Sequence, residues 1–237
     1  MFINTPQDLV NNLTNSGLNI FLYLLQKELR LELRRKAVLS GIVLYLVCLA
    51  FICFITFNLE HDAISPATWS VLFWLVILFS VINSVFRTFI GERKGVFIYY
   101  YAVANPQALI LSKIFYNTIL CSVLSFAGYF FFSLFIGNPV QDPLLFSTCI
   151  LLTSAGFATT LTFISGIASK ANNSNVLMAV LSFPVIIGVL LLAIKITKNA
   201  LDGIDRSASY DEILNLFAIN CIFAALAYLL FPYVWRS

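Results

Sequence analysis

Charged and aromatic side chains gather in residues 87–113, between two long apolar runs. A charged triplet lies between two glycines, aromatic residues follow, and an Asn-Pro pair can then cap and open a new helix. This is the one sizeable segment outside the apolar runs on the predicted cytoplasmic side after the N-terminus, so we expect it to couple the chain to a partner. The candidate coupling residues are Glu92, Arg93, Lys94, Gly95, Tyr99, Tyr101, Pro106 and Lys113.

Motifs for catalysis and phosphate binding are absent from the sequence. It contains no G-x-x-x-x-G-K-[ST] phosphate loop, so any ATP that drives this protein must bind to another subunit. It also contains no H-E-x-x-H, G-x-S-x-G or C-x-x-C motif. We therefore expect no enzymatic activity and no catalytic residue in this chain.

Potential metal and cofactor ligands are few. The five cysteines all fall within apolar runs and have no metal-site spacing, so we interpret them as small packing residues. The single histidine, His61, lies between Glu60 and Asp62. A lone imidazole can ligate a metal or heme iron, but a solvated loop histidine is the favoured interpretation. No metal site and no bound cofactor is predicted.

The composition predicts a polytopic membrane protein. Hydrophobic residues make up 60% of the 237 residues and charged residues 11%, and the apolar residues form long uncharged runs. Each crossing takes roughly 20 apolar residues and must be helical, because lipid offers no partner to unpaired backbone groups. The predicted fold class is an all-α integral membrane protein with six transmembrane helices. The predicted spans are residues 38–57, 67–86, 114–136, 144–168, 176–194 and 213–235.

Residues 18–36 predict an amphipathic helix at the membrane surface. Its apolar face comes from leucines that recur every three or four positions, at Leu18, Leu22, Leu25, Leu29 and Leu33. Basic residues cover much of the rest, which suits anionic head groups. A soluble amphipathic helix that packs on a partner protein is the alternative. The chain thus divides into a tail with an interfacial helix, residues 1–36, and a six-helix transmembrane domain, residues 37–237.

The distribution of Lys and Arg predicts that both termini are cytoplasmic. Eleven of these residues fall on the side of the N-terminus and three on the other, as the positive-inside rule favours. Acidic residues predominate in the outer loops, of which the longest is expected at residues 195–212. No predicted span carries a charged side chain, so ion coupling has no group at membrane depth and the energy must come from elsewhere.

Special residues within the spans give three further expectations. Trp69, Trp74 and Trp235 lie near span ends and predict an aromatic belt at the head groups. Pro184 predicts a kink or a pair of half-helices in the fifth span. The fourth span combines Gly156 with many hydroxyl side chains, which indicates close helix packing, with a substrate path as the alternative.

Residues 87–113, called the coupling segment from here on, also resemble a known family. Glu92, Arg93, Gly95, Pro106 and Lys113, read together with the run YYYAVANPQALILSKIFYN, resemble the ABC-2-type permeases and, within them, the heme exporter protein B family, CcmB. The order of the spans extends this resemblance over nearly the whole chain beyond residue 18. Directly after Gly95, this chain has three apolar residues where the family often places a small polar residue and an acid.

The resemblance implies an ABC-2-type permease architecture and the permease subunit of an ABC transporter for cytochrome c biogenesis. The expected partners are a separate ATP-binding cassette subunit, other cytochrome c maturation membrane proteins, a second copy of the chain and membrane lipid, with no nucleic acid. ATP would bind to the partner subunit, and heme would be the cargo or travel on a partner that ATP hydrolysis releases. The expected location is the bacterial cytoplasmic (inner) membrane. An ABC-2-type exporter of lipid, polysaccharide or drug and a non-conducting assembly scaffold are the alternatives.

Overall fold

The computed structural model describes residue 22 and residues 24–30, 36–60, 65–90, 106–168 and 174–236. Its elements are α3 (Lys36–Glu60), α4 (Pro66–Ile90), α6 (Pro106–Phe135), α7 (Pro143–Ala168), α8 (Ser174–Leu201), the short 3-10 helix η1 (Arg206–Ser209) and α9 (Tyr210–Arg236). Residues 24–30 form a further helical segment. The described ranges contain no strand, so the predicted all-α fold class is confirmed.

The six long helices overlap the six predicted spans. α4, α6, α7, α8 and α9 are long and apolar enough to cross a membrane, and α3 contains a shorter apolar stretch, Ser40–Thr56. Large apolar side chains remain exposed on the outer surface, such as Phe130 of α6 and Leu229 of α9. Such a surface is stable in lipid and costly in water, so the chain is a multi-pass membrane protein.

Proline residues mark where three of these helices begin. α4, α6 and α7 each start at a proline, whose missing N–H and fixed φ suit the first helical position. Before α4, the Ser65 hydroxyl accepts a hydrogen bond from the backbone N–H of Thr68 at 3.1 Å and caps the helix. The expectation that Pro106 opens a new helix is confirmed, because α6 begins at this residue.

The course of α8 excludes the pair of half-helices, one of the two forms predicted at Pro184, while the kink stays a prediction. It runs as one helix from Ser174 to Leu201 with Pro184 inside it. An interior proline removes one backbone hydrogen bond, and membrane helices that pack against neighbours tolerate this loss.

The outer end of α8 also corrects the predicted long outer loop, which is shorter than expected. Charged lysines end the apolar run, but the helix extends past them to Leu201, and Ala200 is fully buried. Gly203 then adopts φ 65°, and the backbone N–H of Ile204 donates to the Asn199 carbonyl at 3.1 Å. A glycine in the left-handed region followed by such a bond is a common way to end a helix.

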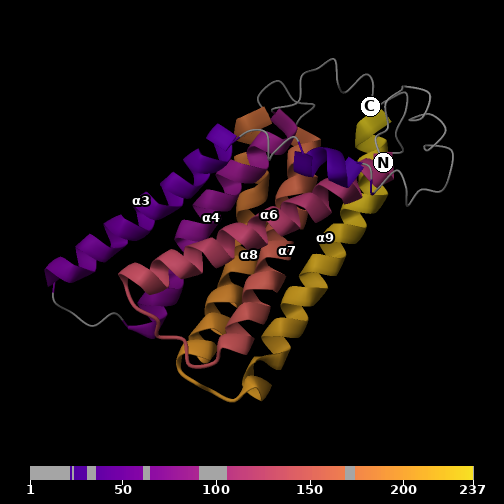
Figure 1. Cartoon of the computed structure of the whole chain (residues 1–237). Coiled ribbons are helices and arrows are strands. Elements are labelled where there is room, and N and C mark those ends of the chain that lie inside the picture. The colour runs from indigo at the N-terminus through magenta and orange to yellow at the C-terminus, as the bar shows by residue number, and fades with distance from the viewer. Residues whose placement is uncertain are drawn as a thin grey trace, which may run out of the picture.

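α7 lies at the centre of the bundle. It packs against α4, α6, α8 and α9, whereas α3 packs on α4 and α6 at one edge (Figure 1). The buried residues of α7 run along its whole length, from Leu145 to Ala168. The helix with the most hydroxyl side chains is therefore the core element of the fold.

Aromatic side chains fill the core near the end of the bundle where α4 and α7 begin, which is called the outer end below. Trp69 stacks on Phe73 with ring centroids 5.3 Å apart, and Phe73 contacts Phe132 at 5.6 Å. Trp69 and Trp74 are 2% and 0% exposed. The predicted aromatic belt is therefore wrong for these two residues, because they lie on the face of α4 that packs against other helices. The side chain of Trp235 lies outside the described residues.

Polar side chains join α6 to α7. Asn117 Nδ2 donates to Thr162 Oγ1 at 2.8 Å, and the Ser125 and Ser154 hydroxyls share a hydrogen bond at 3.1 Å. The two contacts lie eight residues apart on each helix and so define the antiparallel register. These bonds form within one chain, which supports close packing over a substrate path as the role of the hydroxyl groups.

Candidate functional site

The structure describes two of the eight candidate coupling residues. Those outside the described residues are Glu92, Arg93, Lys94, Gly95, Tyr99 and Tyr101. Pro106 is the half-buried first residue of α6. Lys113 lies about two turns further along the same helix and is 0% exposed. Lys113 therefore does not belong to an exposed docking surface.

Lys113 forms an ion pair with the N-terminal helical segment. Its Nζ lies 3.3 Å from Glu28 Oε1, and Glu28 is 8% exposed. Lys27 Nζ lies at the same distance, 3.3 Å, from this oxygen. A charge that is removed from water is stable only when an opposite charge or hydrogen bonds compensate it, so the pairing stabilises both buried charges.

An apolar cluster docks segment 24–30 on the same end of the bundle. Leu24 is 4% exposed and belongs to a buried cluster with Leu109 and Ile110 of α6. The cluster also takes in Phe163 of α7 and Phe231 of α9. Figure 1 shows the segment beside the C-terminal end of α9. The N-terminal segment is therefore a packed part of the bundle.

The buried face of segment 24–30 differs from the predicted leucine stripe. Leu24 and Glu28, four residues apart on one face, are buried. Leu22 is 56% exposed, and Leu25 and Leu29 are half-buried. The described leucines of the stripe therefore keep exposed area for a membrane surface or a partner protein, which are the two interpretations that the amphipathic pattern allows.

The ion pair is not evident in the sequence, because a lysine beside an apolar run usually marks a membrane boundary. One signal for the burial of Lys113 is available. A helix that starts at Pro106 places Lys113 on the same face as Leu109, four residues earlier. The identity of Glu28 as its partner has no such signal, since the pair is 85 residues apart.

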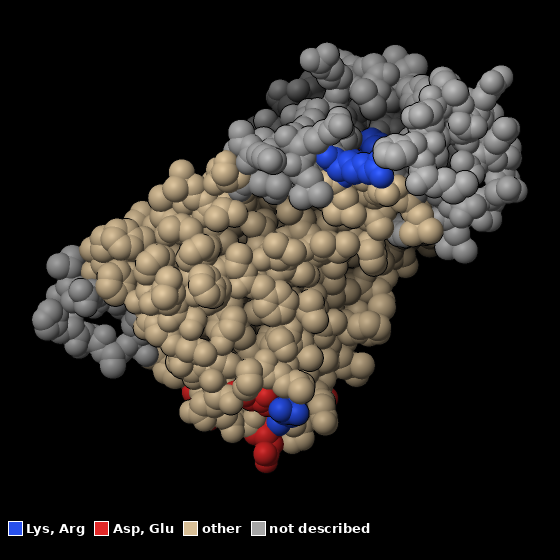
Figure 2. Space-filling view, viewed as in Figure 1, with Lys and Arg blue, Asp and Glu red and all other residues tan. Residues whose placement is uncertain are grey.

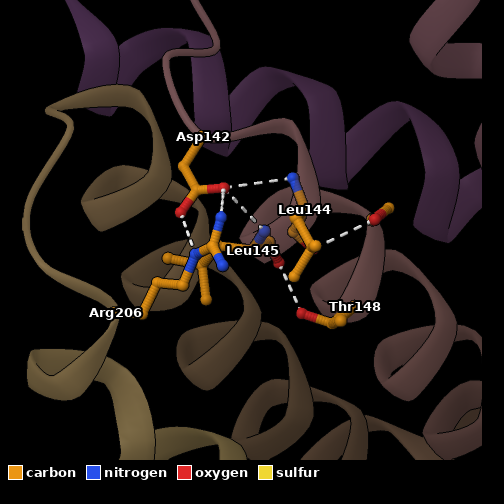
Figure 3. Close-up of polar contacts among 6 residues, drawn as sticks. Asp142, Leu144, Leu145, Thr148 and Arg206 are labelled. Atoms are coloured by element: carbon orange, nitrogen blue, oxygen red, sulfur yellow. Dashed lines mark hydrogen bonds and ion pairs between the residues drawn. The ribbon is translucent and has the colours of Figure 1, made fainter.

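At the opposite end of the bundle, Asp142 ties three helices together. Its carboxylate accepts hydrogen bonds from Arg206 Nε at 2.6 Å and Nη2 at 3.0 Å (Figure 3). It also accepts the backbone N–H groups of Leu144 and Leu145, both at 3.1 Å, and so caps α7. The backbone N–H of Asp142 donates to the Ala200 carbonyl at 3.0 Å. The first turn of α7, the last turn of α8 and the short helix η1 are thus joined through one residue.

The Asp142 contacts predict how stability depends on pH. The pKa of Asp142 is lowered from 3.8 to about 2, chiefly because the Arg206 side chain donates to the carboxylate. Its stabilisation is therefore fully present above pH 3.8 and is lost as the pH falls through about 2. Thermal unfolding in detergent of wild type and Asp142→Asn is expected to differ by a constant amount from about pH 5 to 8 and to converge only as the pH falls through about 2.

An exposed acidic residue of the same end supplies the control for this experiment. Asp202→Asn makes the same chemical change at an exposed position and is expected to leave the unfolding temperature unchanged. A difference between wild type and Asp142→Asn that varies from about pH 5 to 8 would assign the effect to another titrating group.

Metal ligands do not cluster in the described residues. The described part of the chain holds no group of three or more His, Cys, Asp or Glu side chains that could bind a metal ion. All five cysteines are free, and Cys149 Sγ lies 3.6 Å from Thr197 Oγ1 within the core. His61 lies outside the described residues.

Charged side chains of the described residues lie at the two ends of the bundle. Lys27, Arg30 and Lys113 belong to the end with segment 24–30, whereas Asp142 and Asp205 belong to the other. Figure 2 shows basic side chains at one end and acidic side chains, with basic atoms among them, at the other, and an uncharged surface between the two ends on this face. This arrangement suits a bundle whose middle lies in hydrocarbon.

Comparison with known protein families identifies the chain. No curated protein matches it. The family model described as CcmB protein matches residues 19–232, nearly the whole chain, and includes segment 24–30, the first five long helices and most of α9. This match confirms the resemblance seen in the coupling segment. The chain therefore belongs to the CcmB, or heme exporter protein B, family and is a multi-pass membrane component of cytochrome c maturation.

Proposed function

We propose that this chain is the permease subunit of an ABC transporter complex in which a separate subunit hydrolyses ATP. Movement of that subunit drives heme export, or the release of a heme-carrying partner, for cytochrome c maturation. Family membership supports the pathway. The absence of a phosphate loop from the sequence supports a separate ATP-binding subunit.

The observation that carries the proposal is the continuity of α6. This helix runs for 30 residues from Pro106, within the coupling segment, to Phe135 at the opposite end of the bundle. Leu109 and Ile110 in its first turns are 1% and 0% exposed and pack into the bundle. A displacement of the coupling segment therefore passes into the bundle along one helix, without a flexible joint.

The proposed setting is the bacterial inner membrane, with the end that carries segment 24–30 in the cytoplasm. The count of Lys and Arg supports this orientation. The ATPase then docks on the coupling segment from the cytoplasm. Two copies of the chain form the permease, and other cytochrome c maturation membrane proteins join them.

Substitutions in the coupling segment test the proposal. Glu92→Lys, or deletion of residues 99–101, is expected to lower co-purification of the ATPase subunit or its stimulated turnover by about tenfold, with normal membrane insertion. The charge reversal removes attraction to a basic surface of the partner, and the deletion removes aromatic contact area. The measurements are affinity co-purification from detergent, ATP turnover of the complex, and cytochrome c formation in cells.

Asp205→Lys provides the matched control. It makes the same kind of charge reversal at an exposed residue of the opposite end and is expected to leave ATPase binding unchanged. Normal ATPase binding and normal cytochrome c formation in both coupling-segment variants would exclude this segment as the docking site.

A non-conducting assembly scaffold is the second candidate function. The observation in its favour is that polar groups of α7, such as Thr162 and Ser154, bond to α6 within one chain and do not line an open path. The two candidates differ in what the purified dimer contains. A polar path between the two copies, with heme detected by its absorption spectrum, supports export, whereas a dry and fully packed interface supports the scaffold.

A further inference from the structure

The burial of Lys113 is an unusual feature for a lysine near a membrane boundary. A lysine at such a position commonly extends its ammonium group to water. Here the side chain is 1% exposed, and its Nζ points to Glu28 Oε1 at 3.3 Å. The lysine is therefore dehydrated and contacts the N-terminal segment. This contact fixes the position of segment 24–30 relative to α6.

The two sides of this ion pair differ in burial, with side chains that are 1% exposed for Lys113 and 10% exposed for Glu28. Glu28 can keep a partner, because Lys27 Nζ also lies 3.3 Å from its Oε1 and the Lys27 side chain is 22% exposed. Lys113 lies on the face of α6 that packs into the bundle, beside Ser112 and Ile114, which are also buried. Withdrawal of segment 24–30 would remove the Glu28 carboxylate from a buried cation, and breaking a buried ion pair is costly.

The position of the pair along α6 connects it to the coupling segment. Lys113 lies seven residues after Pro106, about 10 Å along a helix that rises 1.5 Å per residue. A displacement that enters α6 at Pro106 reaches Lys113 before it reaches the middle of the bundle. Through Glu28 the same displacement reaches segment 24–30, which precedes α3 in the chain.

The few helix contacts of α3 determine whether a displacement of segment 24–30 could also move α3. α3 packs on α4 and α6 and makes its main contacts with no other helix in the described part of the chain. Residues along it, such as Leu44 and Ile52, are 63% and 58% exposed. A helix with so little packing can shift relative to the bundle at low cost, provided that something pulls on its N-terminal end.

We propose that Glu28 and Lys113 are positioning residues that make segment 24–30 and the first turns of α6 move as one unit. The inference rests on the proposed function, since the displacement comes from the ATPase at the coupling segment. The pair transmits that displacement along a second route, from α6 through segment 24–30 toward α3. Its role is to carry movement, and the ATPase does not need to touch it.

Charge exchange tests this role. Glu28→Lys and Lys113→Glu each place two like charges together, whereas the double exchange restores an opposite pair. Each single variant is expected to lower cytochrome c formation by about tenfold while the ATPase subunit still co-purifies, and the double exchange to recover most of that loss. Arg30→Glu, a charge reversal at an exposed residue of the same segment, is the matched control and is expected to keep wild-type activity.

Protein amount and stability are measured alongside activity for every variant. If a charge reversal lowers the amount of protein in the membrane, Glu28→Gln and Lys113→Gln replace it in the same comparison. Single variants with wild-type activity, or a double exchange no better than the worse single variant at normal protein amount, would overturn the proposal. Loss of ATPase binding in the single variants would also overturn it, because the pair would then belong to the docking surface.

A failure of the proposed function can be distinguished from a failure of the transmission role alone. If the wild-type chain binds no ATP-hydrolysing subunit, the proposed function fails and the transmission role fails with it. The stabilising effect of the Glu28–Lys113 ion pair can still be measured by thermal unfolding in detergent. The single reversals are expected to lower the unfolding temperature, and the double exchange to restore it.

Discussion

Replacement of Trp74 by alanine is expected to lower the free energy of unfolding by about 3 to 5 kcal/mol, the range for loss of a large aromatic side chain from a packed core. Trp74 is 0% exposed and contacts Phe73 with ring centroids 5.1 Å apart. Its Nε1 also donates to Thr197 Oγ1 at 2.8 Å, so alanine leaves a cavity and a buried hydroxyl that loses a partner. Trp74→Phe keeps much of the ring volume and is expected to cost less.

The measurement is chemical or thermal unfolding in detergent, followed by near-ultraviolet circular dichroism. Phe130→Ala is the matched control, because Phe130 is also aromatic but is 62% exposed on the outer surface of α6. We expect Phe130→Ala to change the unfolding transition little. Equal losses from Trp74→Ala and Phe130→Ala would contradict the buried aromatic core and would favour the head-group belt that the sequence predicts.

Replacement of Gly156 by leucine is expected to destabilise the bundle by about 1 to 3 kcal/mol or more, the usual cost of overpacking. A Cβ atom at this position would lie 2.7 Å from Asn220 Oδ1 and 3.2 Å from Val189 Cγ1. Asn220 cannot easily turn away, because its Nδ2 donates to the Leu152 carbonyl at 2.9 Å. The larger side chain would therefore push α8 and α9 away from α7.

Gly188→Leu is the matched control for this change. Gly188 lies in α8, and a Cβ atom there would meet nothing within 4 Å. Leucine at Gly188 is expected to leave the unfolding temperature near that of the wild type, and at Gly156 to lower both this temperature and the yield of folded protein. A similar loss at both sites would show that the contact of Gly156 with α8 and α9 does not set the cost, because leucine has a higher helix propensity than glycine at either site.

Much of the fold follows from local sequence because the membrane imposes simple rules. The six spans are predictable from uncharged runs long enough for hydrocarbon, and the start of α6 from the rigid φ of Pro106. The errors lie where a neighbouring helix overrides a local pattern. α8 passes the lysines and continues to Leu201 because its outer end is packed, and Pro184 leaves it in one piece because neighbouring helices stabilise it.

The candidate site shows the same division. Residues 87–113 and the CcmB resemblance are evident from residue types and their order, and the family match over residues 19–232 confirms that resemblance. The pairing of Glu28 with Lys113 is not predictable, because each looks like an ordinary charge beside a membrane boundary. The pair forms only when segment 24–30 folds back on α6.

The sequence by itself therefore determines the class of protein, its family and the number of apolar helices, since these depend on local composition and on residue order. The tertiary structure alone decides which of those residues face one another. Trp69 and Trp74 are buried, the described leucines of the stripe remain partly exposed, and a boundary lysine is buried within the bundle. The physical reason is that lipid selects for hydrophobicity along each helix, whereas contacts between helices depend on register and direction that no single segment contains.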